Sequence, residues 1–80
     1  SALSLFEQSL ELRQRAGDVR AVAKSLENIA STHLQLGRLA EAQSGLEHAL
    51  ELRRQLGDIA GQAGPLGNFG LVRLAQGDLT

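Results

Sequence analysis

The chain has 80 residues, of which 42% are apolar and 21% charged, and its formal charge at pH 7 is −1. This length allows one domain at most. Because the charge is nearly balanced, no basic field gathers phosphates, and nucleic acid is not expected as a partner. The lack of cysteine excludes disulfides and thiolate metal sites. No apolar run is long enough to cross a bilayer, so we expect no membrane partner and a cytoplasmic location.

The first two expected helices cover residues 2–16 and 19–36. Hydrophobic residues of the second helix follow the three- and four-residue spacing of one helix face, from Val19 to Ile29. Gly17 stands where the first helix should stop, because glycine adopts the left-handed conformation that ends helices. Asp18 follows it and is placed to accept hydrogen bonds from the free N–H groups of the second helix.

The third and fourth expected helices cover residues 39–56 and 59–76. Gly37, Gly57 and Gly77 provide the further stops, and Asp58 and Asp78 the caps; Arg38 leaves the third helix without such a cap. The short connections predict antiparallel neighbours. The expected fold is therefore all-α, without strands.

The fourth helix has the weakest helical sequence. Gly61, Gly64, Gly67 and Gly70 each disfavour a helix interior by about 1 kcal/mol relative to alanine, and Pro65 by about 3 kcal/mol. Proline is tolerated in the first turn, where its missing N–H has no partner to lose. We therefore expect a late or irregular start near Pro65.

The sequence also repeats itself at an offset of forty residues. The run Leu10-Glu11-Leu12-Arg13 returns as Leu50-Glu51-Leu52-Arg53, Gly17-Asp18 as Gly57-Asp58, and Asn28 as Asn68. Matches of leucine and alanine alone are weak evidence in this composition, but matched glycines and asparagines are hard to attribute to chance. Internal repeats of this length indicate stacked supersecondary units.

Small and large apolar residues recur at fixed positions of each unit, and their pattern resembles the tetratricopeptide repeat signature. The matching residues are Ala23, Leu26, Ile29, Ala30, His33, Gly37, Leu39, Ala42, Leu46 and Ala49, and, for a second first helix, Ala63, Leu66, Phe69, Gly70, Gly77 and Leu79. The forty-residue spacing is similar to the subclass of Pins-type scaffolds and bacterial regulatory sensors. The resemblance implies helix hairpins stacked as a right-handed solenoid. His33 and Arg73 depart from the tyrosine usual in the family.

The phase of the repeat leads to a further expectation. In the family's terms the chain starts with the second helix of one repeat and ends after the first helix of another, as a fragment of a longer array would. About three or more stacked repeats are usually needed for independent stability. We therefore expect self-association through the terminal helices, which lack polar capping faces.

The resemblance also implies a binding surface, because the first helix of each repeat lines a concave groove for a peptide or helix. Carried over by position, the groove residues are Lys24, Glu27, Asn28, Ser31, Gln35, Gly67, Asn68 and Leu71. Asn28 and Asn68 share one repeat position and are candidates to hydrogen-bond a ligand backbone; alternatively, they bridge adjacent helices or face water. Glu27 and Ser31 replace the Lys and Asn of the family's carboxylate clamp, which argues against a chaperone-tail ligand.

No residue pattern indicates catalysis. His33 and His48 lie on different expected helices without an acidic partner at ligand spacing, so a zinc site is not expected. No activated nucleophile and no phosphate loop is recognisable, and no cofactor is expected. The leading interpretation is a non-enzymatic protein-interaction scaffold; the alternatives are a structural spacer or oligomerisation segment, and a sensor domain of a larger regulatory protein.

Overall fold

The computed structural model describes residues 1–77 of the chain. Within them the chain forms four α-helices and one short 3₁₀ helix, with no strand, so the predicted all-α architecture is confirmed. The elements are α1 (Ala2–Ala16), α2 (Val19–Gln35), α3 (Leu39–Gln55), the 3₁₀ helix η1 (Ala60–Gln62) and α4 (Ala63–Ala75). Asp78, expected as a helix cap, and Leu79, part of the repeat signature, lie outside the described residues.

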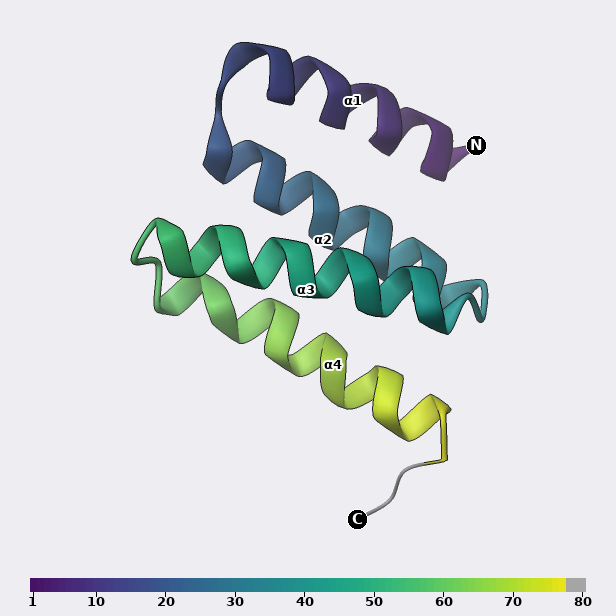
Figure 1. The fold of residues 1–80 in the computed structure, drawn as a ribbon. Coiled ribbons are helices and arrows are strands. Elements are labelled where there is room, and N and C mark those ends of the chain that lie inside the picture. The colour runs from purple at the N-terminus through teal and green to yellow at the C-terminus, as the bar shows by residue number, and fades with distance from the viewer. Residues whose placement is uncertain (78–80) are drawn as a thin grey trace.

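The helices follow one another in antiparallel order, and α1 and α4 lie at opposite edges of the molecule (Figure 1). The most extensive contact is between α2 and α3, α1 packs on α2, and α4 packs on α3 and more narrowly on α2. The molecule is flat, with extents of 40 × 32 × 14 Å. The edge helices α1 and α4 are therefore covered on one side, whereas α2 and α3 have helices on two sides.

Left-handed glycines end the helical segments. Gly17, Gly37, Gly57 and Gly77 all have positive φ, between 67° and 81°, a conformation that costs glycine little. The residue after Gly17 is Asp18, whose Oδ1 accepts a hydrogen bond from the N–H of Ala21 at 3.1 Å. This is the N-cap geometry that favours a helix start.

The third helix starts without such a cap. Arg38 is its N-cap residue and makes no side-chain capping bond. The α2–α3 connection is therefore held by backbone hydrogen bonds, among them Arg38 N–H to His33 O at 2.8 Å.

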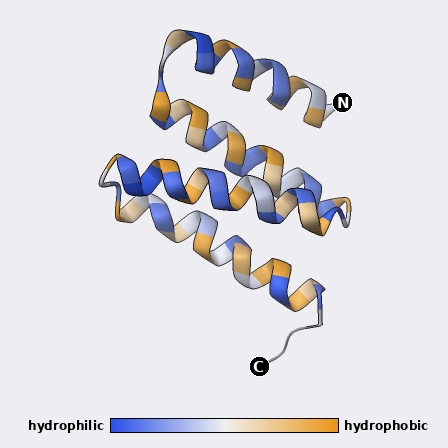
Figure 2. Cartoon of the chain, viewed as in Figure 1, coloured by the Kyte–Doolittle hydropathy of each residue, from blue (hydrophilic) through white to orange (hydrophobic). Residues whose placement is uncertain are grey.

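The core consists of two small clusters between the helices. Ala30, Ala42, Leu46 and Val72 form one, with the half-buried Leu34 and Phe69 against it. Val22, Leu26 and Ala49 form the other. Alanines at the contact points let helix axes approach closely. Hydrophobic and hydrophilic residues alternate along each helix, as expected for helices with one buried face (Figure 2).

The chain enters α4 through η1 rather than through a regular first turn. Pro65 is the third residue of α4 and is buried, and its missing N–H falls among those that have no acceptor within the helix. The C-cap residues of α2, α3 and α4 are Leu36, Leu56 and Gln76. The sequence predicted these same positions as the last residues of the three helices.

Candidate interaction surfaces

A cluster of charged side chains joins three segments of the chain. Arg53 on α3 lies between Glu27 on α2 and Asp58 in the α3–η1 connection. Its Nη2 is 2.7 Å from Glu27 Oε2, and its Nη1 is 3.0 Å from Asp58 Oδ2. The three side chains are only 12–18% exposed, so water screens these pairs less than it screens surface ion pairs.

The environment shifts the proton affinities of two members of this cluster. Hydrogen bonding to Glu27 raises the pKa of Arg53 above its usual value. The hydrogen bond from the Gly61 N–H, 2.9 Å from Asp58 Oδ1, lowers the pKa of Asp58, and Arg53 lowers it further. Both shifts favour the charged forms, so the cluster is a set of ion pairs at neutral pH.

The charged cluster requires a glycine at position 61. A Cβ added there would lie 2.2 Å from Asp58 Oδ2 and 2.9 Å from Arg53 Cδ. These distances are shorter than atomic contact allows, so any other residue would displace the carboxylate. The glycine that weakens the helical sequence is therefore part of the charged cluster.

The predicted groove residues fall into two groups. Lys24, Gln35, Gly67 and Leu71 are exposed, and Asn28, Ser31 and Asn68 are half-buried. Glu27 differs from all of these because its carboxylate is held by Arg53. It is therefore part of the internal charged cluster as well as of the predicted surface.

The two asparagines lie on helices that contact each other, α2 and α4. Asn28 accepts a hydrogen bond from Thr32 Oγ1 at 3.0 Å through its backbone carbonyl, a bond that does not use its side-chain amide. The eight predicted residues are called the α2/α4 face below; besides Glu27, four of them are exposed and three half-buried.

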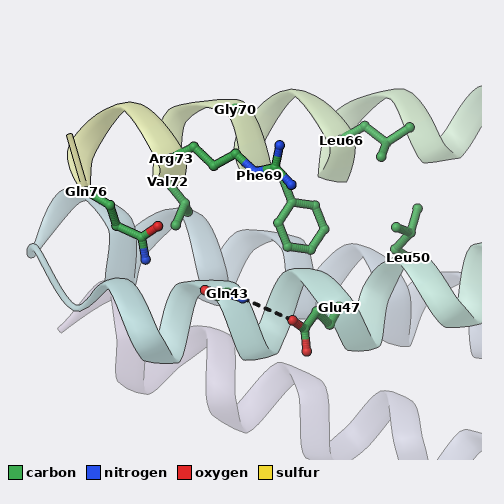
Figure 3. Close-up of a pocket in the computed structure, with 9 residues that line it drawn as sticks. All are labelled: Gln43, Glu47, Leu50, Leu66, Phe69, Gly70, Val72, Arg73 and Gln76. Atoms are coloured by element: carbon green, nitrogen blue, oxygen red, sulfur yellow. Dashed lines mark hydrogen bonds between the residues drawn. The ribbon is translucent and has the colours of Figure 1, made fainter. Parts of the chain in front are cut away.

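A hollow of about 480 Å³ opens between α3 and α4, away from the predicted residues. Figure 3 shows Phe69 pointing from α4 toward α3, above the hydrogen-bonded pair Gln43 and Glu47. None of the eight predicted residues lines this α3/α4 hollow. Its lining is Gln43, Glu47, Leu50, Leu66, Phe69, Gly70, Val72, Arg73 and Gln76.

Sequence reasoning missed the hollow, because equivalent positions of the repeat differ in exposure. Leu66 and Gly70 stand at the repeat positions of Leu26 and Ala30. Leu26 and Ala30 are buried, whereas Leu66 and Gly70 are exposed. A position that is core in one copy and uncovered in the next marks a surface that lacks its neighbour.

Across residues 1–77, no group of three or more His, Cys, Asp or Glu side chains is arranged to hold a metal ion. Over the same residues, none of the helices has both the length and the apolar character that crossing a membrane requires.

The comparisons with known proteins identify a family. The family model of the tetratricopeptide repeat matches residues 1–55, which is more than half of the chain. Neither the search of curated proteins nor the search of solved structures gave a match.

Proposed function

Because the chain belongs to the tetratricopeptide repeat family, whose members generally mediate contacts between proteins, we propose that it holds a peptide or helix on its α2/α4 face. The family is typically a non-enzymatic scaffold. The partner on this proposal is a protein segment, and binding uses a surface that is already formed before the ligand arrives.

The observation that carries the proposal is the contact between α2 and α4. It brings two helices that are separated by α3 in sequence onto one side of the molecule. Equivalent repeat positions, such as those of Asn28 and Asn68, then face the same ligand. An amide at each position offers both a donor and an acceptor to a ligand backbone.

The remaining residues of the face contribute apolar contacts and a polar rim. Leu71 is 51% exposed and offers apolar contact. Lys24 and Gln35 are exposed polar groups at separate turns of α2, which suit a rim around the half-buried centre. A preformed helical groove of this kind binds an amphipathic helix or an extended segment.

A displayed library of random peptides, selected against the 80-residue chain, tests the proposal. We expect the selected peptides to shift the backbone amide NMR signals of α2 and α4. Asn28→Ala with Asn68→Ala should weaken the best peptide at least tenfold. Ser44→Ala on the exposed side of α3 serves as the control and should leave binding unchanged. Peptides whose binding survives the double substitution would refute the assignment of this face.

Self-association is a second candidate function, and the exposed leucines of the edge helices favour it. Leu5 and Leu12 on α1 and Leu66 and Leu74 on α4 are each more than half exposed. A role as spacer or as sensor domain of a larger regulatory protein also stays a prediction. So does the cytoplasmic location, which microscopy of the fluorescently tagged protein would test.

A further inference from the structure

Two apolar faces lie uncovered at opposite edges of the molecule. On α1, Leu5 and Leu12 are 66% and 65% exposed, and on α4, Leu66 and Leu74 are 53% and 60% exposed. Leu5 and Leu12 are seven residues apart, which places them on one side of α1. The two faces cannot meet within one molecule, because α2 and α3 separate α1 from α4 (Figure 1).

The contact between α2 and α3, called the inner interface below, shows how these faces fit together. The forty-residue offset relates α2 to α4 and α1 to α3. The surface of α2 that meets α3 therefore has its counterpart on α4. The surface of α3 that meets α2 has its counterpart on α1. The most extensive interface of the molecule, α2 with α3, thus exists a second time as two unjoined halves.

Several apolar contacts of the inner interface have apolar counterparts forty residues away, exposed except for the half-buried Phe6, although Val22 and Ala49 correspond to the polar Gln62 and Ser9. Leu52 of α3 packs against the cluster that contains Leu26; forty residues earlier and later, these positions are Leu12 and Leu66. Leu34 packs against the cluster that contains Ala42 and Leu46 of α3. The counterparts of these three are Leu74, Ala2 and Phe6.

The inner interface contains one close approach between helices, and its counterpart carries a larger pair of side chains. A Cβ added to Gly45 of α3 would lie 3.1 Å from Ala30 Cβ on α2, so the two helices nearly touch there. The counterpart of Gly45 is Leu5, and that of Ala30 is Gly70. The missing methyl group of Gly70 makes room for only part of the Leu5 side chain, so an α1 placed on α4 would lie farther from it than α3 lies from α2. Around Gly70 there is open space, with nothing within 4 Å of an added Cβ.

We propose that α1 of a second copy of this chain docks head to tail into the α3/α4 hollow, with Leu5 over Gly70 and Leu12 beside Leu66. The contact uses the repeat positions of the α2–α3 interface, with a wider helix spacing at Leu5. It rests on the self-association named under Proposed function, specifies its interface, and shares only Gly67 with the α2/α4 face. Because the two contacting faces differ, the contact is heterologous, and each added molecule exposes the same two faces again.

One contact of the inner interface has no counterpart between molecules. Arg53 pairs with Glu27 within the chain, but the residue at the Glu27 position of α4 is Gly67. The intermolecular contact therefore lacks an interhelical ion pair. Association is expected to be weaker than the inner packing and to depend on concentration.

Complementary variants test the head-to-tail geometry. Leu5→Glu with Leu12→Glu disables the α1 face, and Gly70→Glu disables the hollow. In sedimentation velocity, we expect the wild-type mass to rise with concentration and each variant alone to be a monomer. A mixture of the two variants should form a dimer and nothing larger, because it contains one intact face of each kind.

Controls separate association from folding. Gly70→Glu should keep the helical circular dichroism signal, because glycine is the weaker helix former and the site is open. Leu36→Glu changes a leucine that is 56% exposed outside both faces, and should associate like the wild type. If Leu36→Glu also prevents association, the contact is nonspecific and the proposal fails.

Other outcomes overturn the proposal at different levels. A wild-type chain that stays monomeric up to about 1 mM, the weak end of specific binding, has no self-association of any geometry. An α1 variant that still dimerises alone shows that α4 pairs with α4 instead. A mixture of variants that remains monomeric shows that the two faces do not meet.

A strengthened interface provides an independent test of register. Gly67→Glu restores a carboxylate at the Glu27 position, opposite Arg13 of the second copy, the counterpart of Arg53. Arg13 would pair with it in addition to, or in exchange for, its hydrogen bonds to Ser25 and Ala21. An added Cβ at Gly67 meets nothing within 4 Å. We expect the dissociation constant to fall about fivefold, with the gain lost in high salt. Gly67→Gln adds the same helix propensity without charge; an equal gain from it would contradict the proposed register.

Discussion

Leu26 of α2 and Leu66 of α4 occupy the same position of the repeat, but Leu26 is 9% exposed and Leu66 is 53% exposed. Ala23 and Asn28 recur beside them as Ala63 and Asn68, but glycine and proline replace the residues between. The two leucines also differ in what covers them. α3 lies over α2, whereas no helix of residues 1–77 lies in the same way over α4. Burial in this molecule is thus a property of a residue's place in the stack as much as of its side chain.

The arginines of the repeat show the same contrast. Arg13 donates from Nη1 to Ser25 Oγ at 2.6 Å and to the carbonyl of Ala21 at 3.3 Å. Its counterpart Arg53 would meet Pro65 at the Ser25 position, which offers no hydroxyl. Arg53 pairs instead with Glu27 and Asp58. Equivalent arginines therefore stabilise the two halves by different partners.

The largest effect is expected from truncating the two equivalent leucines. Leu26→Ala should lower the free energy of unfolding by about 2–5 kcal/mol, because it leaves a cavity in the core. Leu66→Ala should cost less than about 1 kcal/mol, measured by urea unfolding at a concentration where the chain is monomeric. Equal losses would show that Leu66 is covered within the monomer.

Two glycines of the α4 region should respond in opposite directions to alanine. Gly61→Ala should destabilise by about 1–3 kcal/mol, since the new methyl group displaces Asp58 from Arg53. Gly70→Ala should stabilise by about 0.5–1 kcal/mol through helix propensity alone. Thermal unfolding followed by circular dichroism measures both. A stabilised Gly61→Ala variant would refute the role of the charged cluster.

Acid should weaken the same cluster. Because the folded state lowers the pKa of Asp58, this group contributes stability that is present above the unfolded value near 3.8. The contribution is lost as pH falls through the lower folded value. Asp58→Asn should flatten the decline of stability below pH 4, measured by urea unfolding at a series of pH values. Asp18→Asn is the repeat-matched control, and an equal effect there would contradict the special place of Asp58.

The smallest effect is expected at the uncapped start of α3. Arg38→Asp should raise the free energy of unfolding by about 0.5–1 kcal/mol, because an aspartate at the N-cap accepts a backbone hydrogen bond as Asp18 does. Thermal unfolding detects this change. A lower midpoint would indicate that Arg38 has a stabilising contact of its own.

Most of the fold could be predicted because its signals are local. Glycines with positive φ stand at all four stops, and helix spacing identifies the faces that pack. The α3/α4 hollow could not be predicted this way, because exposure of Gly70 and Leu66 depends on which helix is next to α4. The charged cluster also escaped prediction: Arg53 and Glu27 are 26 residues apart in sequence, and only the packing of α2 on α3 brings them together.

Glu27 itself illustrates why the candidate site was harder to predict than the fold. Position in the repeat placed it on the binding face, and nothing in its neighbours along the chain indicated an ion pair. A carboxylate held by a guanidinium is less available to a ligand than a free one. The other seven residues of the α2/α4 face stay predictions; four are exposed and three half-buried.

The guanidinium of Arg53 links three consecutive parts of the chain. From α3 it forms ion pairs with Glu27 on α2 and with Asp58 at the entry to α4. The angle at which α4 leaves the preceding hairpin is therefore set partly by electrostatics. In a stack of such units, this angle determines the curvature of the whole superhelix. Because the three side chains are 12–18% exposed, salt screens these pairs little, and the angle would hold as ionic strength changes.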